Sequence, residues 1–235
     1  MTLQQCDIGL ETLRRMSALD AYNRWIIHEI QPWVGDVVLE VGAGIGNIAQ
    51  FFFERKQLIL TDVQKDYIEL LHNKFVNYSN ISYELYDLEE SGEHLQNRGI
   101  DTIIALNVLE HIRDDVHALR ELAAILSPGG HLILQLPAHR FLYGSLDRYL
   151  DHYRRYTMGD IKNKFRVAGL TPVKLWRINI FGTFGWFMCS RVLRRKILPT
   201  NSLSIFNKLT PVFTAFERMV PIPFGLSIIA VGRKK

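Results

Sequence analysis

The sequence predicts an α/β fold in which a mostly parallel β-sheet carries helices on both faces. Short apolar runs of strand length alternate with stretches of helical periodicity along the 235 residues. Residues 38–47, Val-Leu-Glu-Val-Gly-Ala-Gly-Ile-Gly-Asn, end a buried strand in a glycine-rich turn. A second apolar run, 58–62, ends in Asp62, 22 residues after Glu40. Because parallel sheets bind ligands at the carboxyl ends of their strands, the turn and the acid predict a nucleotide-type site.

The elements are expected in a regular order. An amphipathic helix over 10–31 precedes the first strand, and a helix follows the glycine turn. The apolar spacing from Leu109 to Leu126 predicts a helix packed on the sheet. The expected strands are 37–41, 58–62, 81–86, 100–106, 131–136, 172–178 and 226–232.

Size and composition predict one principal domain, because 235 residues that are 48% apolar can bury a single α/β core. The two cysteines, Cys6 and Cys189, form no C-x-x-C pair, which argues against a disulfide framework or a zinc site. We therefore expect a reducing compartment and no bound metal. The amino terminus lacks the basic start and apolar run of a secretory signal, so the expected location is cytoplasmic, with the inner membrane face left open.

Polar signals recur after the later strands. Asp87 follows the third, residues 101–107 form a fourth that ends in Asn107, and Leu-Ser-Pro-Gly-Gly at 126–130 precedes the fifth. From about Gly35 to Leu136 this series resembles the class I S-adenosylmethionine-dependent methyltransferases, because the motifs recur at that family's spacing. The NAD fingerprint has glycine at the position of Asn47, so the spacing favours S-adenosylmethionine over NAD. The resemblance implies a Rossmann-like seven-stranded sheet, mostly parallel with the last strand antiparallel, and a helical insertion before that strand.

The resemblance also implies where the cofactor binds. Glu40 and the glycine turn would lie under the methionine part, Asp62 would bind the ribose, and Val63 with the pair at 87–88 would border the adenine. Residues 107 and 108 would line the sulfonium. The expected cofactor-binding residues are Tyr22, Glu40, Gly42, Ala43, Gly44, Asn47, Asp62, Val63, Asp87, Leu88, Asn107 and Val108.

Relatives cover the cofactor with an amino-terminal segment, so 1–34 is expected to be a helical lid. The core then comprises 35–178 and 226–235, and 179–225 is the helical insertion. Tyr22 either contacts the methionine carboxylate or the methyl channel, or it belongs to an aromatic patch that holds the lid to the sheet.

Residues 137–156 are expected to form the acceptor site. They leave a strand at its ligand-binding end and are dense in His, Tyr, Arg and Asp without helical or strand periodicity. Their Ser…Asp pair and the following His-Tyr-Arg-Arg-Tyr resemble a subgroup of bacterial methyltransferases. The substrate-binding candidates are His139, Asp147, Tyr153, Arg154 and Arg155.

An oxygen acceptor must lose a proton, and imidazole titrates nearest to neutral pH, so His152 and His111 are the candidate catalytic bases, with His139 behind them. His111 has the alternative of donating to a backbone carbonyl. Asp147 either orients a histidine, binds an acceptor hydroxyl or caps the next turn.

The two arginines at 154 and 155 have forked donors that suit a phosphate, sulfate or carboxylate. We expect one of them to bind such an anion and the other to pair with Asp147 or Asp151 and fix the loop. Tyr153 serves either recognition or packing.

The insertion carries an apolar and a basic segment. Residues 178–190 are uncharged and aromatic-rich, but 13 residues are too few for a bilayer that needs about 20. Thr210-Pro211 is expected to begin a new helix. Four basic residues follow the uncharged run, and three more end the sequence. Together they carry a charge of +7, whereas the whole chain has a net charge of +4, so the remaining residues sum to −3. The four are Arg191, Arg194, Arg195 and Lys196.

A basic cluster beside aromatic side chains is typical of a surface for anionic lipid or a lipid-linked phosphate. The alternatives are a hairpin that covers the core, or a dimer interface with a solvated basic rim, and the oligomeric state stays open. The cluster is compact and lacks the long basic groove of nucleic-acid-binding proteins, so nucleic acid is not the expected partner.

The sequence therefore predicts transfer of a methyl group from S-adenosylmethionine, with S-adenosylhomocysteine as product, to an oxygen of a small-molecule, sugar or lipid-linked acceptor. N-methylation of an amino sugar or lipid amine is the first alternative. A non-catalytic cofactor-binding subunit at a membrane is the second, and an NAD oxidoreductase is the third.

Overall fold

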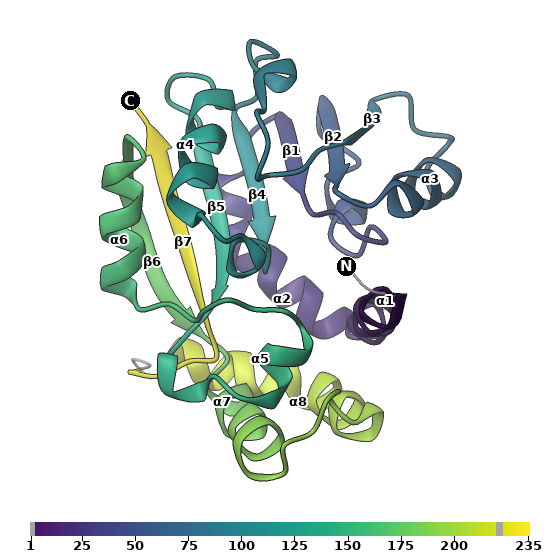
Figure 1. The fold of residues 1–235 in the computed structure, drawn as a ribbon, viewed down its shortest axis with the longest axis vertical. Coiled ribbons are helices and arrows are strands. Elements are labelled where there is room, and N and C mark those ends of the chain that lie inside the picture. The colour runs from purple at the N-terminus through teal and green to yellow at the C-terminus, as the bar shows by residue number, and fades with distance from the viewer. Residues whose placement is uncertain (1–2, 220–222) are drawn as a thin grey trace.

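The computed structural model describes residues 3–219 and 223–235. Its centre is a seven-stranded sheet with the order β3-β2-β1-β4-β5-β7-β6 (Figure 1). The strands are β1 Val37–Val41, β2 Gln57–Asp62, β3 Ile81–Leu85, β4 Thr102–Leu106, β5 His131–Pro137, β6 Leu170–Ile178 and β7 Ser227–Lys234. Strand β7 runs antiparallel to both of its neighbours, whereas the other pairs are parallel. The predicted sheet is therefore confirmed, including its antiparallel last strand.

Eight α-helices lie in the described part of the chain, and short 3-10 turns separate several of them from the strands. The helices are α1 Leu3–Ser17, α2 Asp20–Ile30, α3 Lys65–Lys74, α4 Asp115–Ile125, α5 Ser145–Tyr149, α6 Met158–Val167, α7 Ile180–Phe187 and α8 Thr200–Met219.

Alternate residues along each central strand enter two different cores, because successive side chains of a strand point to opposite faces. Leu39 and Ile103 join the core under α4 and α6, whereas Val38 and Ile104 join the core under α2 and α3. Burial on both faces explains why the strands are almost uniformly apolar.

The entry helix predicted over 10–31 is two helices, so that prediction was wrong in its continuity. Helix α1 ends at Ser17, and Leu19 has the non-helical angles φ −95° and ψ 58°. The Asn23 side chain donates to the carbonyl of Met16 at 3.1 Å, which satisfies one of the free carbonyls at the end of α1.

The helix expected directly after the glycine turn is also absent from the described residues. A 3-10 turn, Ala49–Phe51, replaces it. Gly42, Gly44 and Gly46 all have positive φ, between 54° and 76°, and three such residues within five positions prevent a regular helix from starting there.

Two further helix boundaries differ from the prediction. The periodic stretch 109–126 begins as a 3-10 turn, Leu109–His111, and α4 starts only after Asp114, whose side chain accepts from His117 N at 3.0 Å. Pro211 does not begin a new helix but lies inside α8. The neighbouring Thr210 hydroxyl donates to Phe206 O at 2.9 Å within the same helix.

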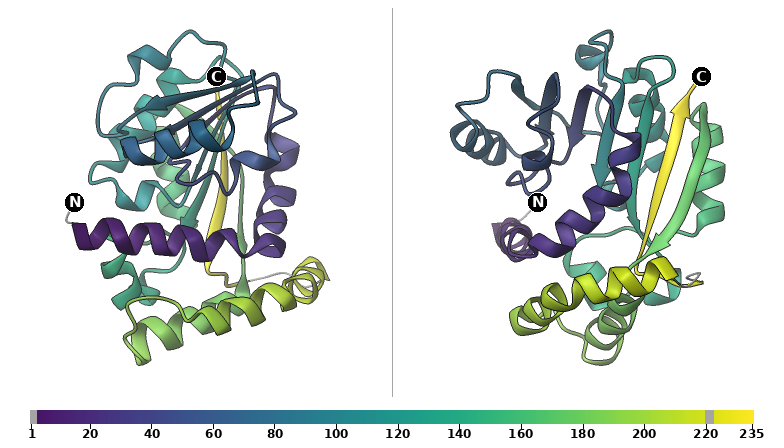
Figure 2. Two further views of the ribbon diagram at one scale, coloured as in Figure 1. Left: turned by 90° about the vertical axis from the view of Figure 1, so that its right-hand side faces the viewer. Right: turned by 180° about the vertical axis from the view of Figure 1, so that it is seen from behind.

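The helices between β6 and β7 lie at the end of the sheet where the parallel strands finish. Figure 1 shows α5, α7 and α8 beyond the carboxyl ends of β4 and β5, and both views of Figure 2 show α1 beside α8 at this end. The Arg15 guanidinium of α1 donates to Leu198 O, directly before α8, at 2.5 Å. The amino-terminal helices and the insertion thus border the same end of the sheet.

Candidate active site

The glycine turn after β1 and the end of β2 form one bonded unit. Asp62 Oδ2 accepts from Gly44 N at 2.9 Å, and its Oδ1 accepts from Gln64 N at 3.0 Å. Burial raises the pKa of the Asp62 carboxyl, while these backbone hydrogen bonds oppose that rise. A Cβ on Gly42 would lie 2.7 Å from Val108 Cγ2, so the turn also packs directly against the residue after β4.

Glu40 is the unsatisfied group of this corner. Its side chain is buried, and among the described residues its Oε2 has no hydrogen-bond partner. Burial, with a contribution from the charge of Asp62, raises the pKa of Glu40 to about 8. A buried carboxyl oxygen without a donor is costly, so this position suits a ligand that brings a cation or an N–H.

Helix α1 contacts the glycine turn. Asn47 Nδ2 donates to Leu13 O of α1 at 2.9 Å, and a Cβ on Gly44 would lie 3.0 Å from Leu13 Cδ1. Asn47 therefore joins α1 to the turn, a contact that the sequence did not predict.

Tyr22 is buried in an aromatic cluster. The centroid of its ring lies 6.1 Å from that of Trp25 and 5.9 Å from that of Phe206 of α8. Its hydroxyl accepts from Gln135 Nε2 at 3.1 Å. These contacts match the predicted aromatic patch. Gln135 was missed, although a single amide in the apolar run of β5 is a signal that could have identified it.

The remaining cofactor candidates border the same corner with different exposure. Val63 is 56% exposed after β2, whereas Leu88 is buried. The Asp87 carboxylate accepts from Glu89 N at 2.8 Å and so shapes its own turn. Asn107 directly follows β4, where it is exposed and has a positive φ of 55°. Ala43, in the glycine turn, donates its N–H to Thr61 O.

The two candidate bases meet in a second cluster. The rings of His111 and His152 lie 4.7 Å apart at 88°, although 41 positions separate them in the chain. His152 Nδ1 lies 3.2 Å from Asp147 Oδ1, and His152 Nε2 lies 4.0 Å from Glu110 Oε1. His152 is buried, whereas His111 is exposed.

Two buried acids, Glu110 and Asp147, belong to this cluster, and their pKa values are shifted in opposite directions. Burial raises the pKa of Glu110 to about 7, and neither of its oxygens has a hydrogen-bond partner in the described residues. Burial also acts to raise the pKa of Asp147, but the hydrogen bond from His152 and the charge of Arg155 outweigh it and leave that pKa lowered. Desolvation by the surrounding protein, with a smaller contribution from the charge of His152, lowers the pKa of His111 to about 3, so its imidazole is neutral at pH 7 and weakly basic.

The same cluster has the donor set of a cation site. Glu110, His111 and His152 each place one ligand atom within 4.8 Å of the others. Two imidazoles and a carboxylate suit transition metals such as zinc or iron. Sequence reasoning missed this grouping because Glu110 and His152 come together only in the fold.

Arg155 takes the structural role that was expected of one arginine. Its Nε donates to Asp147 Oδ1 at 2.7 Å, its Nη1 donates to Ala138 O at 2.9 Å, and its guanidinium lies 4.6 Å from the ring of Trp186. Asp147 meanwhile accepts from Gly144 N, so it orients His152 and caps a turn at the same time.

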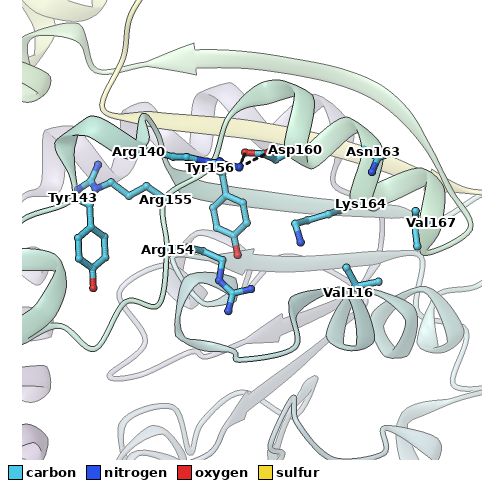
Figure 3. A pocket seen from close by; sticks show the side chains of 10 residues that line it. All are labelled: Val116, Arg140, Tyr143, Arg154, Arg155, Tyr156, Asp160, Asn163, Lys164 and Val167. Atoms are coloured by element: carbon cyan, nitrogen blue, oxygen red, sulfur yellow. Dashed lines mark hydrogen bonds and ion pairs between the residues drawn. The ribbon is translucent and has the colours of Figure 1, made fainter.

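Arg154 borders a polar pocket of about 580 Å³ between α4, α6 and residues 137–156, the predicted acceptor loop (Figure 3). Three basic side chains point toward this pocket, and each is paired with a carboxylate. Arg140 pairs with Asp160, and both Arg154 and Lys164 pair with Asp115. Tyr156 also donates to Asp115 at 3.0 Å. The sequence did not indicate Asp115 as the common partner of these groups.

The two other acceptor candidates differ in their relation to the histidine pair, since Tyr153 directly follows His152 and donates its N–H to Glu110 O at 2.8 Å, whereas His139 begins the same segment near other rings. Tyr153 is exposed, and the guanidiniums of Arg113 and Arg154 lie within 5.8 Å of its ring. His139 has a positive φ of 61°, and its ring lies near Phe141 and Phe224.

Part of the sequence is similar to known proteins. The family model described as "Methyltransferase domain" matches residues 39–132. Polyketide synthase PksR of Bacillus subtilis is 28% identical over 120 residues, which are 46% of this chain and 5% of that protein. The highly reducing polyketide synthase stpks1 of Strobilurus tenacellus is 32% identical over 107 residues, 41% of this chain and 4% of that protein. The chain thus matches only about one-twentieth of the length of these relatives.

Solved structures share the fold over most of the chain. An S-adenosylmethionine-dependent methyltransferase from Mesorhizobium loti has a TM-score of 0.63 at 16% identity and covers 92% of this chain and 100% of its own. The YcgJ protein of Bacillus subtilis has a TM-score of 0.60 at 18% identity, covering 91% and 97%.

Proposed function

Because the chain belongs to the class I methyltransferases, we propose that it transfers the methyl group of S-adenosylmethionine to an oxygen of a small-molecule, sugar or lipid-linked acceptor. The observation that carries the proposal is the contact of His152, which follows α5, with His111, which lies in the 3-10 turn after β4 close to Asn107 and Val108 in the chain. A neutral imidazole at that place serves an acceptor that must lose a proton.

The residues of the glycine turn fit the cofactor. The unpaired Glu40 oxygen suits the ammonium of the methionine part. Beside it, Val108 and Leu13 pack against the places that a Cβ would take on Gly42 and Gly44. Asp62 is proposed to bind the ribose hydroxyls through the acceptor capacity that its two backbone hydrogen bonds leave free. Tyr22 and Asn47 act through the lid, by holding α2 and α1 against the sheet and the turn.

S-adenosylmethionine, when bound, supplies a methyl group that is already activated on a sulfonium. The protein's own part is therefore to hold the acceptor in line, exclude water and remove a proton. We assign proton removal to an imidazole nitrogen of His111, since this ring is exposed whereas that of His152 is buried. His152 is the positioning residue behind it, held by Asp147, which Arg155 fixes in turn.

Tyr153 and Arg154 are the proposed acceptor contacts, because both reach the surface beside this cluster. Asp147 and Arg155 are buried against each other, so their contribution to the acceptor is indirect. His139 is proposed as a further contact at the other end of the same loop. The proposed location is the cytoplasm. Among residues 3–219 and 223–235, none of the helices could span a membrane.

The proposal is tested with methyl-labelled S-adenosylmethionine and a host-cell extract, with Asp62→Ala as the blank. Label that enters a product with the parent protein, and not with the blank, supports methyl transfer. Binding of S-adenosylhomocysteine without any labelled product would favour a non-catalytic cofactor-binding subunit. Labelling that survives both His111→Ala and His152→Ala would favour an amine acceptor, which needs no strong base.

A further inference from the structure

Helix α8 has an apolar stripe on its outer face. Five apolar side chains recur at intervals of three and four residues, which places them on one side of the helix. All five are exposed, from 43% at Leu209 to 82% at Met219. They are Ile205, Leu209, Val212, Phe216 and Met219. The opposite side of α8, which includes Phe206 and the buried Thr210, packs toward α2.

Helix α7 extends this stripe into a broader face. The ring of Phe181 stacks on Phe213 at 4.1 Å and meets Phe216 edge-on at 5.6 Å. Phe184, one turn further along α7, is 72% exposed, and Val192 and Leu193 are exposed after it. We call these residues and the α8 stripe the α7–α8 face. Contiguous exposed apolar side chains of this kind mark interaction surfaces.

The charge beside this face has one sign. Residues 180–219 contain Arg191, Arg194, Arg195, Lys196, Lys208 and Arg218 but only one acid, Glu217. The Glu217 carboxylate is turned inward and accepts from Asn179 N and Ile180 N. None of the four basic residues at 191–196 takes part in an ion pair within residues 3–219 and 223–235. An anionic partner is therefore favoured.

The face lies at the same end of the molecule as the candidate active site. Figure 1 and Figure 2 show α7 and α8 beyond the carboxyl ends of the parallel strands. Contacts join them to the acceptor loop, since Ser145 Oγ donates to Ser190 O at 3.0 Å and Arg155 lies over Trp186 of α7. A partner on this face would thus lie beside the loop that carries His152.

We propose that the α7–α8 face docks on an anionic lipid bilayer. The exposed apolar side chains enter the interface, and the basic residues bind the lipid headgroups, the two forces that hold amphipathic helices on membranes. Docking itself does not depend on the proposed transfer. Its consequence, that the acceptor is a lipid or lipid-linked molecule which enters from the bilayer, does rest on the proposed function.

The test is cosedimentation of the full chain with vesicles of phosphatidylcholine alone or mixed with phosphatidylglycerol. The expected result is binding to the mixed vesicles that weakens as salt is raised. Val212→Glu is expected to lower the binding constant about tenfold or more. Val76→Glu is the matched control, because Val76 and Val212 are both 63% exposed and Val76 follows α3, away from the face. Arg194→Glu should weaken binding about tenfold, whereas Arg166→Glu on α6 should not.

Three results would overturn the proposal. The first is equal binding of the protein to the two vesicle types. The second is an equal loss of vesicle binding in Val212→Glu and Val76→Glu. The third is self-association that Val212→Glu abolishes, because it would assign the face to a second copy of the chain. Calorimetric binding of S-adenosylhomocysteine by each variant separates these outcomes from misfolding. Since vesicle binding is measured without methyl transfer, a failure of docking and a failure of the proposed function remain distinguishable.

Discussion

His152 Nδ1 lies 3.2 Å from Asp147 Oδ1 of α5, and this contact fixes the orientation of the buried ring. The pKa of Asp147 is lowered, so its carboxylate accepts and the Nδ1 carries the proton. His152 Nε2 then faces Glu110, and the ring edge faces His111. The loop thus positions one histidine behind another, an arrangement that supports a base at the exposed position.

The first prediction separates the roles of the two histidines. His111→Ala should lower kcat for an oxygen acceptor by about 10²-fold to 10⁴-fold, because it removes the group that takes the proton. Added imidazole should restore part of that rate, since the vacated place is exposed. His152→Ala should lower kcat without such rescue, because its site is buried. His117→Ala, an exposed histidine on α4, is the control. Rescue of His152→Ala alone would reverse the assignment.

A chelator added to the same assays would reveal a metal bound by Glu110, His111 and His152. The expected sign of such a metal is a loss of activity that an added divalent metal restores.

The second prediction concerns stability of the acceptor loop. Asp147→Ala should lower the free energy of unfolding by about 3–5 kcal/mol, because it leaves the buried Arg155 without its carboxylate. Asp20→Ala removes an exposed pair with Arg24 and should cost at most about 1 kcal/mol. Urea unfolding at neutral pH measures both. Similar losses for the two variants would show that Ala138 O and Trp186 are enough to hold Arg155.

The third prediction is a pH dependence that arises at Glu110. Its folded-state pKa of about 7 exceeds the ordinary carboxyl value, so the folded protein binds more protons than the unfolded chain between about pH 4.5 and 7. Stability from this group is therefore full below about pH 4.5 and is lost as pH rises through 7. The wild type should become less stable relative to Glu110→Gln by a few kcal/mol between pH 5 and 8. A constant difference across that range, measured by urea unfolding, would mean that Glu110 is ionised in the fold.

The sequence predicted the sheet because its signals are local. Apolar strand segments such as 58–60 follow from a sheet buried on both faces, and the polar residues Asp62 and Asn107 mark where two of the strands end. The helix boundaries were less predictable, since they depend on single contacts. Asn23 reaching Met16 O divides the entry helix, and Asp114 capping His117 N delays α4.

The candidate site was predictable in composition but not in pairing. The loop 137–156 was identified by its density of His, Tyr, Arg and Asp. The partners of those residues come from distant segments, however: Glu110 and His111 approach His152, Asp115 pairs with Arg154, and Trp186 lies under Arg155. Such contacts depend on how the loop folds over β4 and α7, which no local pattern encodes.

The fourth prediction tests the ribose role of Asp62. Asp62→Asn keeps one oxygen, which can accept from Gly44 N or Gln64 N but not from both, so a melting curve must first show that the variant is folded. The affinity for S-adenosylhomocysteine should nevertheless fall about tenfold or more, since one carboxylate oxygen becomes a donor and no longer matches the diol. Asp87→Asn alters the neighbouring turn and serves as the comparison. Calorimetry that finds parent-like affinity in Asp62→Asn would remove Asp62 from the cofactor site.

The fifth prediction follows from the unpaired oxygen of Glu40. With its pKa raised to about 8, Glu40 is mostly protonated at pH 7 and must ionise to pair with the ammonium of S-adenosylhomocysteine. Ligand binding at pH 7 should therefore release a proton, and the affinity should rise as pH rises toward 8. Glu40→Gln should bind about tenfold or more weakly, without the proton release that calorimetry detects in buffers of different ionisation enthalpy. Glu29→Gln, on α2, is the control for loss of a carboxylate outside the turn. Proton release that persists unchanged in Glu40→Gln would assign the titrating group elsewhere and leave the unpaired oxygen without a cofactor partner.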